Sequence, residues 1–187
     1  LAPLFLAIIS ILAKWLIIGR FKQGSHCLWG GYYFRWWFVR RISKLVPLTY
    51  FAGTPLINVY YRLMGAKIGN NVWIGTVDFD APDLISIGDN TVIAADSSLS
   101  TTSIAKGRFY TSFIEIGNDC CIGTKCIIGA SSKIGNSAVI EDLSSLLPGT
   151  VVESFSTWTG IPARETQSHT PRKPQRITRR TKRISQR

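Results

Sequence analysis

The chain has 187 residues, enough for one domain with a substantial core and extensions at its ends. Its net charge of +11 is unevenly spread, since residues 1–67 sum to +9, residues 68–163 to −6 and residues 164–187 to +8. The four cysteines form no C-x-x-C pair and both histidines lie outside the repeat described below, which argues against a bound metal and a metal-dependent activity.

Residues 1–19 read LAPLFLAIISILAKWLIIG and carry one charge, at Lys14. At this length and apolarity we predict a transmembrane helix over residues 1–22, with a buried helix of a soluble domain as the alternative. A signal peptide is not favoured because no small-residue cleavage site follows. The chain begins at Leu1 inside an apolar run, and we interpret it as a piece of a longer protein.

Residues 23–67 combine aromatic and basic side chains and contain no acid, with LWGGYYFRWWF at residues 28–38. Such side chains collect at the boundary between membrane and water, and an excess of Lys and Arg marks the cytoplasmic side of a span. We therefore predict interfacial amphipathic helices that contact membrane lipids, with the rest of the chain on the cytoplasmic side. Single-stranded nucleic acid binds similar mixtures, but that interpretation leaves the adjacent apolar run unexplained. We expect no nucleic acid partner for this segment.

A six-residue repeat runs through residues 68–163, and it is unbroken from Ile116 onward. Every sixth residue there is apolar, and a small residue follows four positions later. A period of six fits neither a helix nor an alternating strand, but it fits short strands joined by turns, with the apolar residue pointing inward on every face. The apolar positions are Ile116, Ile122, Ile128, Ile134, Ile140, Leu146, Val152 and Trp158.

The repeat has edges and interruptions. A helix over Leu56–Met64 is predicted to cap the first coil and cover its open strand edges. Thirteen residues separate Ile74 from Ile87, which requires a bulge or small loop, and a longer loop interrupts the repeat at residues 100–115. Insertions in solenoids lie on one face, frequently the working one. Residues 164–187 are predicted to form a disordered basic tail, either solvated or in contact with anionic lipid or nucleic acid.

The hexads resemble those of the hexapeptide acyltransferases, which implies a mainly β fold, a left-handed parallel β-helix, here preceded by membrane-associated helices. The segment WTGIPAR, residues 158–164, resembles the closing motif of that superfamily. The resemblance implies coenzyme A bound along the groove between coils, and cations suit its phosphates. Pro162 simply ending the last coil is the alternative. The candidate cofactor residues are Gly129, Lys133, Gly160, Pro162 and Arg164.

The order of the motifs is more specific than the hexads. An apolar span, then LWGGYYFRWWFVRR, AGTPLINVYYRLMGAKIG, TVDFDAPDLISIGDNTVI and WTGIPA resemble the membrane-embedded C-terminal modules of ε-poly-lysine synthetase type nonribosomal peptide synthetases. That resemblance implies an acyltransferase-like module whose donor is coenzyme A or a carrier-bound phosphopantetheine thioester. It also implies a carrier domain or sister modules as partners, in a trimer or pseudo-trimer.

The loop of related modules carries a histidine where this chain has Thr102. Threonine has no group that titrates near neutral pH and cannot replace imidazole as a general base. We take Thr102 and Asp80 as the candidate catalytic residues, with Asp78, Asp83 and Asp96 as neighbouring polar candidates, since an aspartate could weakly deprotonate or position an amine. We consider His26 an unlikely substitute because it lies in the segment next to the membrane. Two hypotheses follow. The chain transfers an acyl or aminoacyl group from a thioester to an amine, with an active or a degenerate site, or it is a non-catalytic scaffold packing against sister modules.

Overall fold

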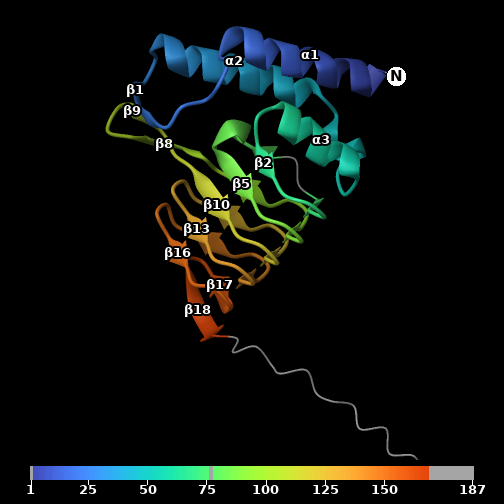
Figure 1. Ribbon diagram of the computed structural model, residues 1–187. Helices are drawn as coiled ribbons and strands as arrows, with labels where there is room; N and C mark the ends of the chain where they lie inside the picture. The colour runs from blue at the N-terminus through green and yellow to red at the C-terminus, as the bar shows by residue number, and fades with distance from the viewer. Residues whose placement is uncertain (1, 76–77, 169–187) are drawn as a thin grey trace, which may run out of the picture.

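The computed structural model describes residues 2–75 and 78–168. Figure 1 shows a layer of helices at one end of the molecule and a stack of coils that runs away from it. Two long helices lie side by side on the outside of this layer, and a shorter one lies between them and the first coil. The helices are α1 (Ala2–Ile17), α2 (Gly31–Leu45), α3 (Pro55–Leu63) and the 3-10 turns η1 (Leu48–Tyr50) and η2 (Pro82–Leu84).

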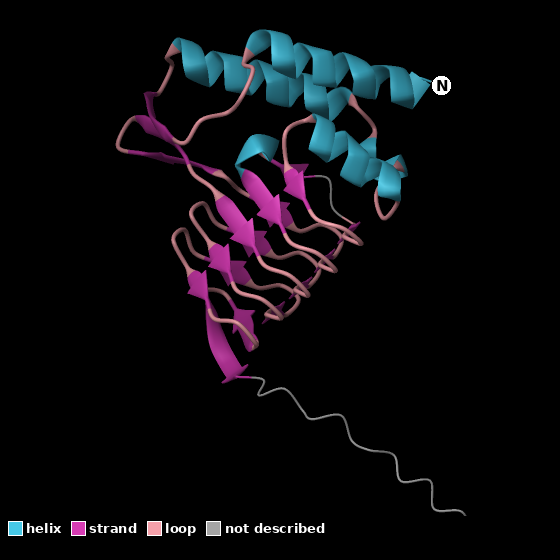
Figure 2. Cartoon of the chain, viewed as in Figure 1, coloured by secondary structure: helices cyan, strands magenta, loops and turns pink. Residues whose placement is uncertain are grey.

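The coils form a parallel β-helix, as the hexads predict, and their short strands stack in three sheets. Figure 2 shows these strands separated by tight turns. The first sheet contains β2 (Lys67–Ile68), β5 (Ile85–Ile87), β10 (Ile114–Ile116), β13 (Lys133–Ile134) and β16 (Val151–Val152). The second contains β3 (Trp73–Ile74), β6 (Val92–Ile93), β11 (Cys121–Ile122), β14 (Val139–Ile140) and β17 (Ser156–Gly160), with β18 (Ala163–Ser168) added antiparallel at its edge. The third contains β4 (Asp78–Phe79), β7 (Ser98–Leu99), β12 (Ile127–Ile128) and β15 (Ser145–Leu146).

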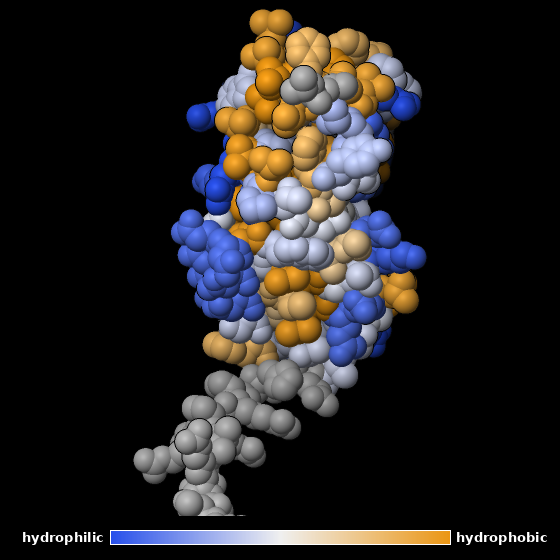
Figure 3. Space-filling model, turned by 90° about the vertical axis from the view of Figure 1, so that its right-hand side faces the viewer, coloured by the Kyte–Doolittle hydropathy of each residue, from blue (hydrophilic) through white to orange (hydrophobic). Residues whose placement is uncertain are grey.

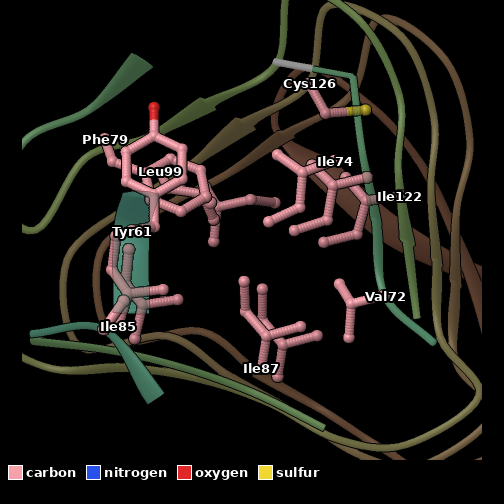
Figure 4. Packing of buried hydrophobic residues seen from close by; sticks show 14 of the residues in the cluster. Tyr61, Val72, Ile74, Phe79, Ile85, Ile87, Leu99, Ile122 and Cys126 are labelled. Carbon is pink, nitrogen blue, oxygen red and sulfur yellow. The ribbon is translucent and has the colours of Figure 1, made fainter. Parts of the chain in front are cut away.

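Strand register aligns the predicted apolar residues into columns inside the β-helix. In the second sheet, Ile74 pairs with Ile93, Ile93 with Ile122 and Ile122 with Ile140, and all four side chains are buried. Figure 4 shows such side chains from neighbouring coils lying over one another in the interior. Because each coil buries its apolar residues only against the coils beside it, the core is continuous along the stack.

The corners of the coils explain the other positions of the hexad. At the regular corners, the residue three places after the inward apolar residue adopts a positive φ, as at Asn90, Asp119 and Lys125, which turns the chain into the next strand. The glycine after the apolar residue allows the coils to stack closely. A Cβ at Gly123 would lie 2.7 Å from the backbone nitrogen of Asp142 in the next coil.

The small residue of the hexad occupies the inside of the corner. Cys120 and Cys126 are buried, and their thiols donate hydrogen bonds to the carbonyl oxygens of Gly135 and Glu141, at 3.1 Å in each case. Burial raises the pKa of both thiols. Both cysteines are free thiols, so their role is structural, as the repeat phase indicates.

Helix α3 closes the first coil, as predicted. Ile57 and Tyr61 are buried, and Tyr61 stacks on Phe79 of the coil with 4.1 Å between ring centroids. Asn58 Nδ2 and Arg62 Nε donate hydrogen bonds to the carbonyl oxygens of Val72 and Ile68. These side chains satisfy backbone acceptors that have no further coil to bond with.

Helix α1 is shorter than the transmembrane helix predicted over residues 1–22. It has 16 residues and spans about 24 Å, whereas a hydrocarbon core measures about 30 Å. It ends where the amides of Ile18 and Gly19 both bond to the carbonyl of Lys14. Within residues 2–75 and 78–168, no helix combines the length and apolarity needed to cross a membrane, so the predicted span is not supported.

Helix α1 also differs from an ordinary surface helix, because polar side chains are buried and large apolar side chains are exposed. Its buried face carries Ser10 and Lys14, both fully buried, while Phe5, Leu12 and Leu16 are exposed. The Lys14 ammonium lies 2.8 Å from a carboxylate oxygen of Asp83, which follows the first coil. Burial lowers the pKa of Lys14, and its hydrogen bond to Asp83 opposes this effect. The ion pair therefore fixes α1 to the β-helix through its polar face.

The interruption at residues 100–115 forms a β-hairpin, which we call the arm. It consists of β8 (Thr102–Ala105) and β9 (Arg108–Thr111). Strand β1 (Gly24–Cys27), from the segment between α1 and α2, adds to β9 in an antiparallel three-stranded sheet. Phe109 of the arm is fully buried and packs on Trp36 of α2, with 4.7 Å between ring centroids. The arm is thus held by the N-terminal part of its own chain.

The end of the β-helix differs from the prediction. Strand β18 (Ala163–Ser168) pairs antiparallel with β17, so residues 164–168 belong to a hairpin and not to the basic tail predicted from residue 164. The hairpin covers the last coil with its own backbone hydrogen bonds, which the hexad pattern does not encode. The remainder of that tail, residues 169–187, lies outside the described residues.

Candidate functional site

The two residues predicted for catalysis lie in contact at the base of the arm. Asp80 follows strand β4 and Thr102 opens β8, and parallel pairing of β4 with β7 brings their segments together. The Thr102 hydroxyl donates a hydrogen bond to Oδ2 of Asp80 at 2.9 Å. Phe79 points into the core, so the acidic residues on either side of it, Asp78 and Asp80, point outward.

Arg40 of α2 reaches this site from the helical layer. Its guanidinium contacts Asp80 Oδ1 and also lies 3.3 Å from Asp78 Oδ1. The second oxygen of Asp78 accepts a hydrogen bond from Ser98 at 3.1 Å. Arg40, Asp78, Asp80, Ser98 and Thr102 together form what we call the Asp80 cluster.

The cluster has an uneven distribution of charge and exposure. It contains two carboxylates and one guanidinium, so it carries one excess negative charge. Both carboxylates have a partner on each oxygen, but the Asp80 side chain is 8% exposed and the Asp78 side chain is 46% exposed. Asp78 is therefore the carboxylate that can accept a further donor.

This arrangement can orient a polar group more readily than it can remove a proton. Asp80 would have to give up a contact with Arg40 or Thr102 to act as a base, and the Thr102 hydroxyl is not ionisable near neutral pH. The cluster is suited to holding a cation or a hydrogen-bond donor beside Asp78.

His26 lies nearer to the arm than the sequence suggests. It belongs to β1 and pairs with Phe109 of β9, and its ring stacks on Tyr32 at 3.8 Å between centroids. Strand β9 separates β1 from β8, so the backbones of His26 and Thr102 are about 10 Å or more apart. His26 therefore does not occupy the place of the missing histidine. Its position beside the arm depends on the pairing of β1 with β9, which are far apart in the sequence, and no local sequence pattern reveals that pairing.

The candidate cofactor residues do not form one site. A Cβ at Gly129 would lie 2.6 Å from the nitrogen of Pro148, so this glycine is required for coil stacking. Lys133 lies on the first sheet and pairs with Glu115 at 3.0 Å. Gly160, Pro162 and Arg164 belong to the closing β17–β18 hairpin, at the far edge of the second sheet.

The hairpin residues proposed to bind the cofactor lie far from the Asp80 cluster. The hairpin lies three coils from Thr102 and four coils from Asp80, about 14 and 19 Å along the stack. Arg164 is exposed and faces Thr159 across the hairpin. Because these residues do not converge on one cradle, no phosphate contact is assigned to any of them. Among the described residues, no group of three or more His, Cys, Asp or Glu side chains is placed to hold a metal ion.

Comparison with solved structures identifies the architecture. A hexapeptide-repeat acetyltransferase from Vibrio cholerae aligns over 90% of this chain and 93% of its own, with a TM-score of 0.52 and 15% identity. A structure of a hexapeptide-repeat acetyltransferase from Vibrio cholerae O1 biovar eltor, complexed with acetyl coenzyme A, aligns over 56% of this chain and 60% of its own, with a TM-score of 0.52 and 24% identity. The chain has the hexapeptide-repeat acetyltransferase fold.

Comparison of sequences adds one curated relative. The chain is 31% identical over 158 residues to the δ-poly-L-ornithine synthetase of Acinetobacter baumannii (strain AB307-0294). The alignment covers 84% of this chain but 12% of the synthetase, so the chain spans a small part of that protein's length. No protein-family model matches the sequence.

Sequence reasoning named Asp78 as a neighbouring polar candidate, but it missed Arg40 and Ser98 as members of the cluster. One signal was available, because residues 1–67 contain no acid and three aspartates occur close together within TVDFDAPD, at the end of the first coil. In the structure, each of these aspartates pairs with a basic residue of that segment, Asp78 and Asp80 with Arg40 and Asp83 with Lys14. The charge imbalance between segments thus indicated where the helices dock.

Proposed function

We propose that the chain is an acyltransferase-like module of a nonribosomal peptide synthetase-type protein, built for transfer of an acyl or aminoacyl group from a thioester to an amine, with a catalytically degenerate site. The observation that carries the proposal is the Asp80 cluster at the base of the arm, on a hexapeptide-repeat acetyltransferase fold. The similarity to a poly-ornithine synthetase supports an assembly that joins amino acids. Membership of the ε-poly-lysine synthetase type is part of the same proposal.

The proposed donor is coenzyme A or a carrier-bound phosphopantetheine thioester. Support comes from the structure of the same fold that is complexed with acetyl coenzyme A. The donor supplies the activated acyl group, and the residues of this chain would orient the acceptor. We propose Asp78 for that role, because its carboxylate is the exposed one of the cluster.

The cluster favours a degenerate site over an active one. Thr102 supplies no base, and Asp80 has both oxygens occupied. The alternative function, a non-catalytic scaffold that packs against sister modules, is favoured by the same observation. The outward column Trp73, Val92, Cys121 and Val139 on the second sheet offers an exposed and partly apolar surface for such packing. The proposed partners are a carrier domain or sister modules, assembled as a trimer or pseudo-trimer.

The variant Thr102→His tests the two functions. Asp80 is placed to accept a hydrogen bond from one imidazole nitrogen and so to orient the other as a base. We expect the wild-type chain to transfer acyl groups from acetyl coenzyme A to a primary amine at the background rate. Thr102→His is expected to raise transfer by about 10²- to 10⁴-fold, measured by release of free thiol.

Ser103→His is the matched control, because it places imidazole on the opposite face of the same strand. Equal rates for wild type, Thr102→His and Ser103→His, all at background, would favour the scaffold. Wild-type turnover that is insensitive to Thr102→Val would locate the chemistry elsewhere.

We also propose that the module rests on the cytoplasmic face of a membrane through α1 and α2. Large apolar side chains cover the outer face of both helices, including Leu12 and Leu16 of α1 and Phe34 and Phe38 of α2. Figure 3 shows hydrophobic surface gathered at the helical end of the molecule. Five basic residues accompany it, and no acid occurs in residues 1–67, which suits anionic head groups. They are Arg20, Lys22, Arg35, Arg41 and Lys44.

Vesicle binding tests this surface. We expect the chain to sediment with vesicles that contain anionic lipid and to be released as salt rises. Leu16, 89% exposed, contributes apolar surface to the contact, so Leu16→Glu is expected to weaken binding by about tenfold or more. Leu147→Glu, at an exposed position of the β-helix, should bind as wild type does. Equal weakening in both variants, or no sedimentation of the wild type, would contradict the proposal.

A further inference from the structure

A cavity lies between the helical layer and the first coil. Its volume is 460 Å³, within the range of small-molecule sites. Helices α2 and α3, the turn η1 and the strand β4 all contribute to its lining. Most of its wall is apolar and comes from Val39, Leu48, Met64, Phe79 and Pro82.

One buried polar group on this wall has no partner in the protein. Tyr61 lines the cavity and is 2% exposed, and among the described residues none hydrogen-bonds its hydroxyl. Figure 4 shows this hydroxyl pointing away from the stacked isoleucines of the core. Burial, with further contributions from Tyr60 and Asp78, raises the pKa of Tyr61 well above its usual value, so the hydroxyl stays protonated. A buried hydroxyl without a partner costs stability unless a ligand bonds to it.

The Asp80 cluster forms one side of the same cavity. Arg40, Asp78 and Asp80 are all lining residues, and Asp78 presents its half-exposed carboxylate. Because one guanidinium faces two carboxylates, this side carries one excess negative charge, which favours a cation. Lys44 also lines the cavity, but its side chain is exposed at the rim.

We propose that this cavity binds a primary amine carried on an aliphatic chain. The ammonium lies between the Asp78 carboxylate and the Tyr61 hydroxyl, and the aliphatic chain packs along Val39, Leu48 and Phe79. The inference deepens the proposed function, since it makes this cavity the acceptor subsite beside Thr102. It assigns the acceptor to the cap of the β-helix, between the helical layer and the first coil.

Binding is measured by calorimetry on the purified chain without any acyl donor, with hexylamine, 1-hexanol and hexanoate as probes. Hexylamine is expected to bind at least tenfold more tightly than 1-hexanol, because both fill the apolar wall and only the amine pairs with Asp78. Hexanoate is expected not to bind. Tighter binding of hexanoate than of hexylamine overturns the proposal and indicates an anion site at Arg40 and Lys44.

Variants separate the two polar contacts. Asp78→Asn is expected to reduce hexylamine affinity by tenfold or more, and Tyr61→Phe by about threefold to tenfold. Tyr61→Phe should leave the melting temperature of the ligand-free chain unchanged or higher, since the lost hydroxyl has no partner. Asp119→Asn makes the same change as Asp78→Asn at an exposed corner of the β-helix outside the cavity, and it should retain affinity. Unchanged affinity in Asp78→Asn overturns the proposal.

The outcome is independent of the acyl-transfer assay. Amine binding in a chain that never transfers an acyl group supports the subsite and rejects catalysis. Transfer activity with no amine binding in this cavity, and no effect of Tyr61→Phe on the KM for the amine, supports the proposed function and rejects the subsite.

Discussion

Lys14→Met is expected to lower the free energy of unfolding by about 3–5 kcal/mol, because it leaves the Asp83 carboxylate buried without its cation. Asp83 is 9% exposed, accepts hydrogen bonds from the Lys14 ammonium and from the amide of Phe21, and connects α1 to the β-helix. Urea denaturation followed by circular dichroism measures the loss. Methionine keeps most of the apolar stem of lysine, so the change isolates the charge.

Two comparisons make this result specific. Lys67→Met, at an exposed position on β2, is expected to change stability by less than about 0.5 kcal/mol. The double variant Lys14→Met with Asp83→Asn removes both charges and is expected to recover part of the loss. A Lys14→Met chain as stable as wild type would show that α1 is not fixed through this pair.

Ile128→Ala is expected to cost about 2–5 kcal/mol, whereas Ile127→Ala changes stability by about 0.5 kcal/mol or less. The two residues are neighbours on β12, and Ile128 is fully buried while Ile127 is 51% exposed. Truncating Ile128 leaves a cavity between Leu99 and Leu146 of the adjoining coils, which pack above and below it.

The same denaturation measurement compares the two variants. Equal losses at positions 127 and 128 would contradict the inward column and the strand register that produces it. The pair is well matched, since the side chain, the strand and the sheet are the same and only the direction of the side chain differs.

The β-helix was predictable because its signal is local. Each apolar residue, its glycine and its small residue repeat every six positions. Counting in sixes from Ile116 therefore predicts every inward-pointing residue as far as Val152. The capping helix was predictable for the same reason, since Gly65 and the periodic apolar residues before it mark its end.

The docking of the helices was not predictable in this way. Lys14 reads as a single charge in an apolar run, and its partner Asp83 lies 69 residues away. Arg40 reads as one of many basic residues in an interfacial segment, and Asp78 lies 38 residues away. The contact of Thr102 with Asp80 was anticipated only as proximity, because its hydrogen bond depends on how the arm leaves its coil.

The pairing of the arm with β1 limits how this polypeptide can be truncated. Strand β9 is the middle strand of its sheet, with β8 on one side and β1 on the other. Cutting the chain after residue 67 to obtain the coils alone would remove β1, turn β9 into an open edge and uncover Phe109. The helical segment and the coils therefore form one unit for expression, and shortened versions need to retain residues 24–27.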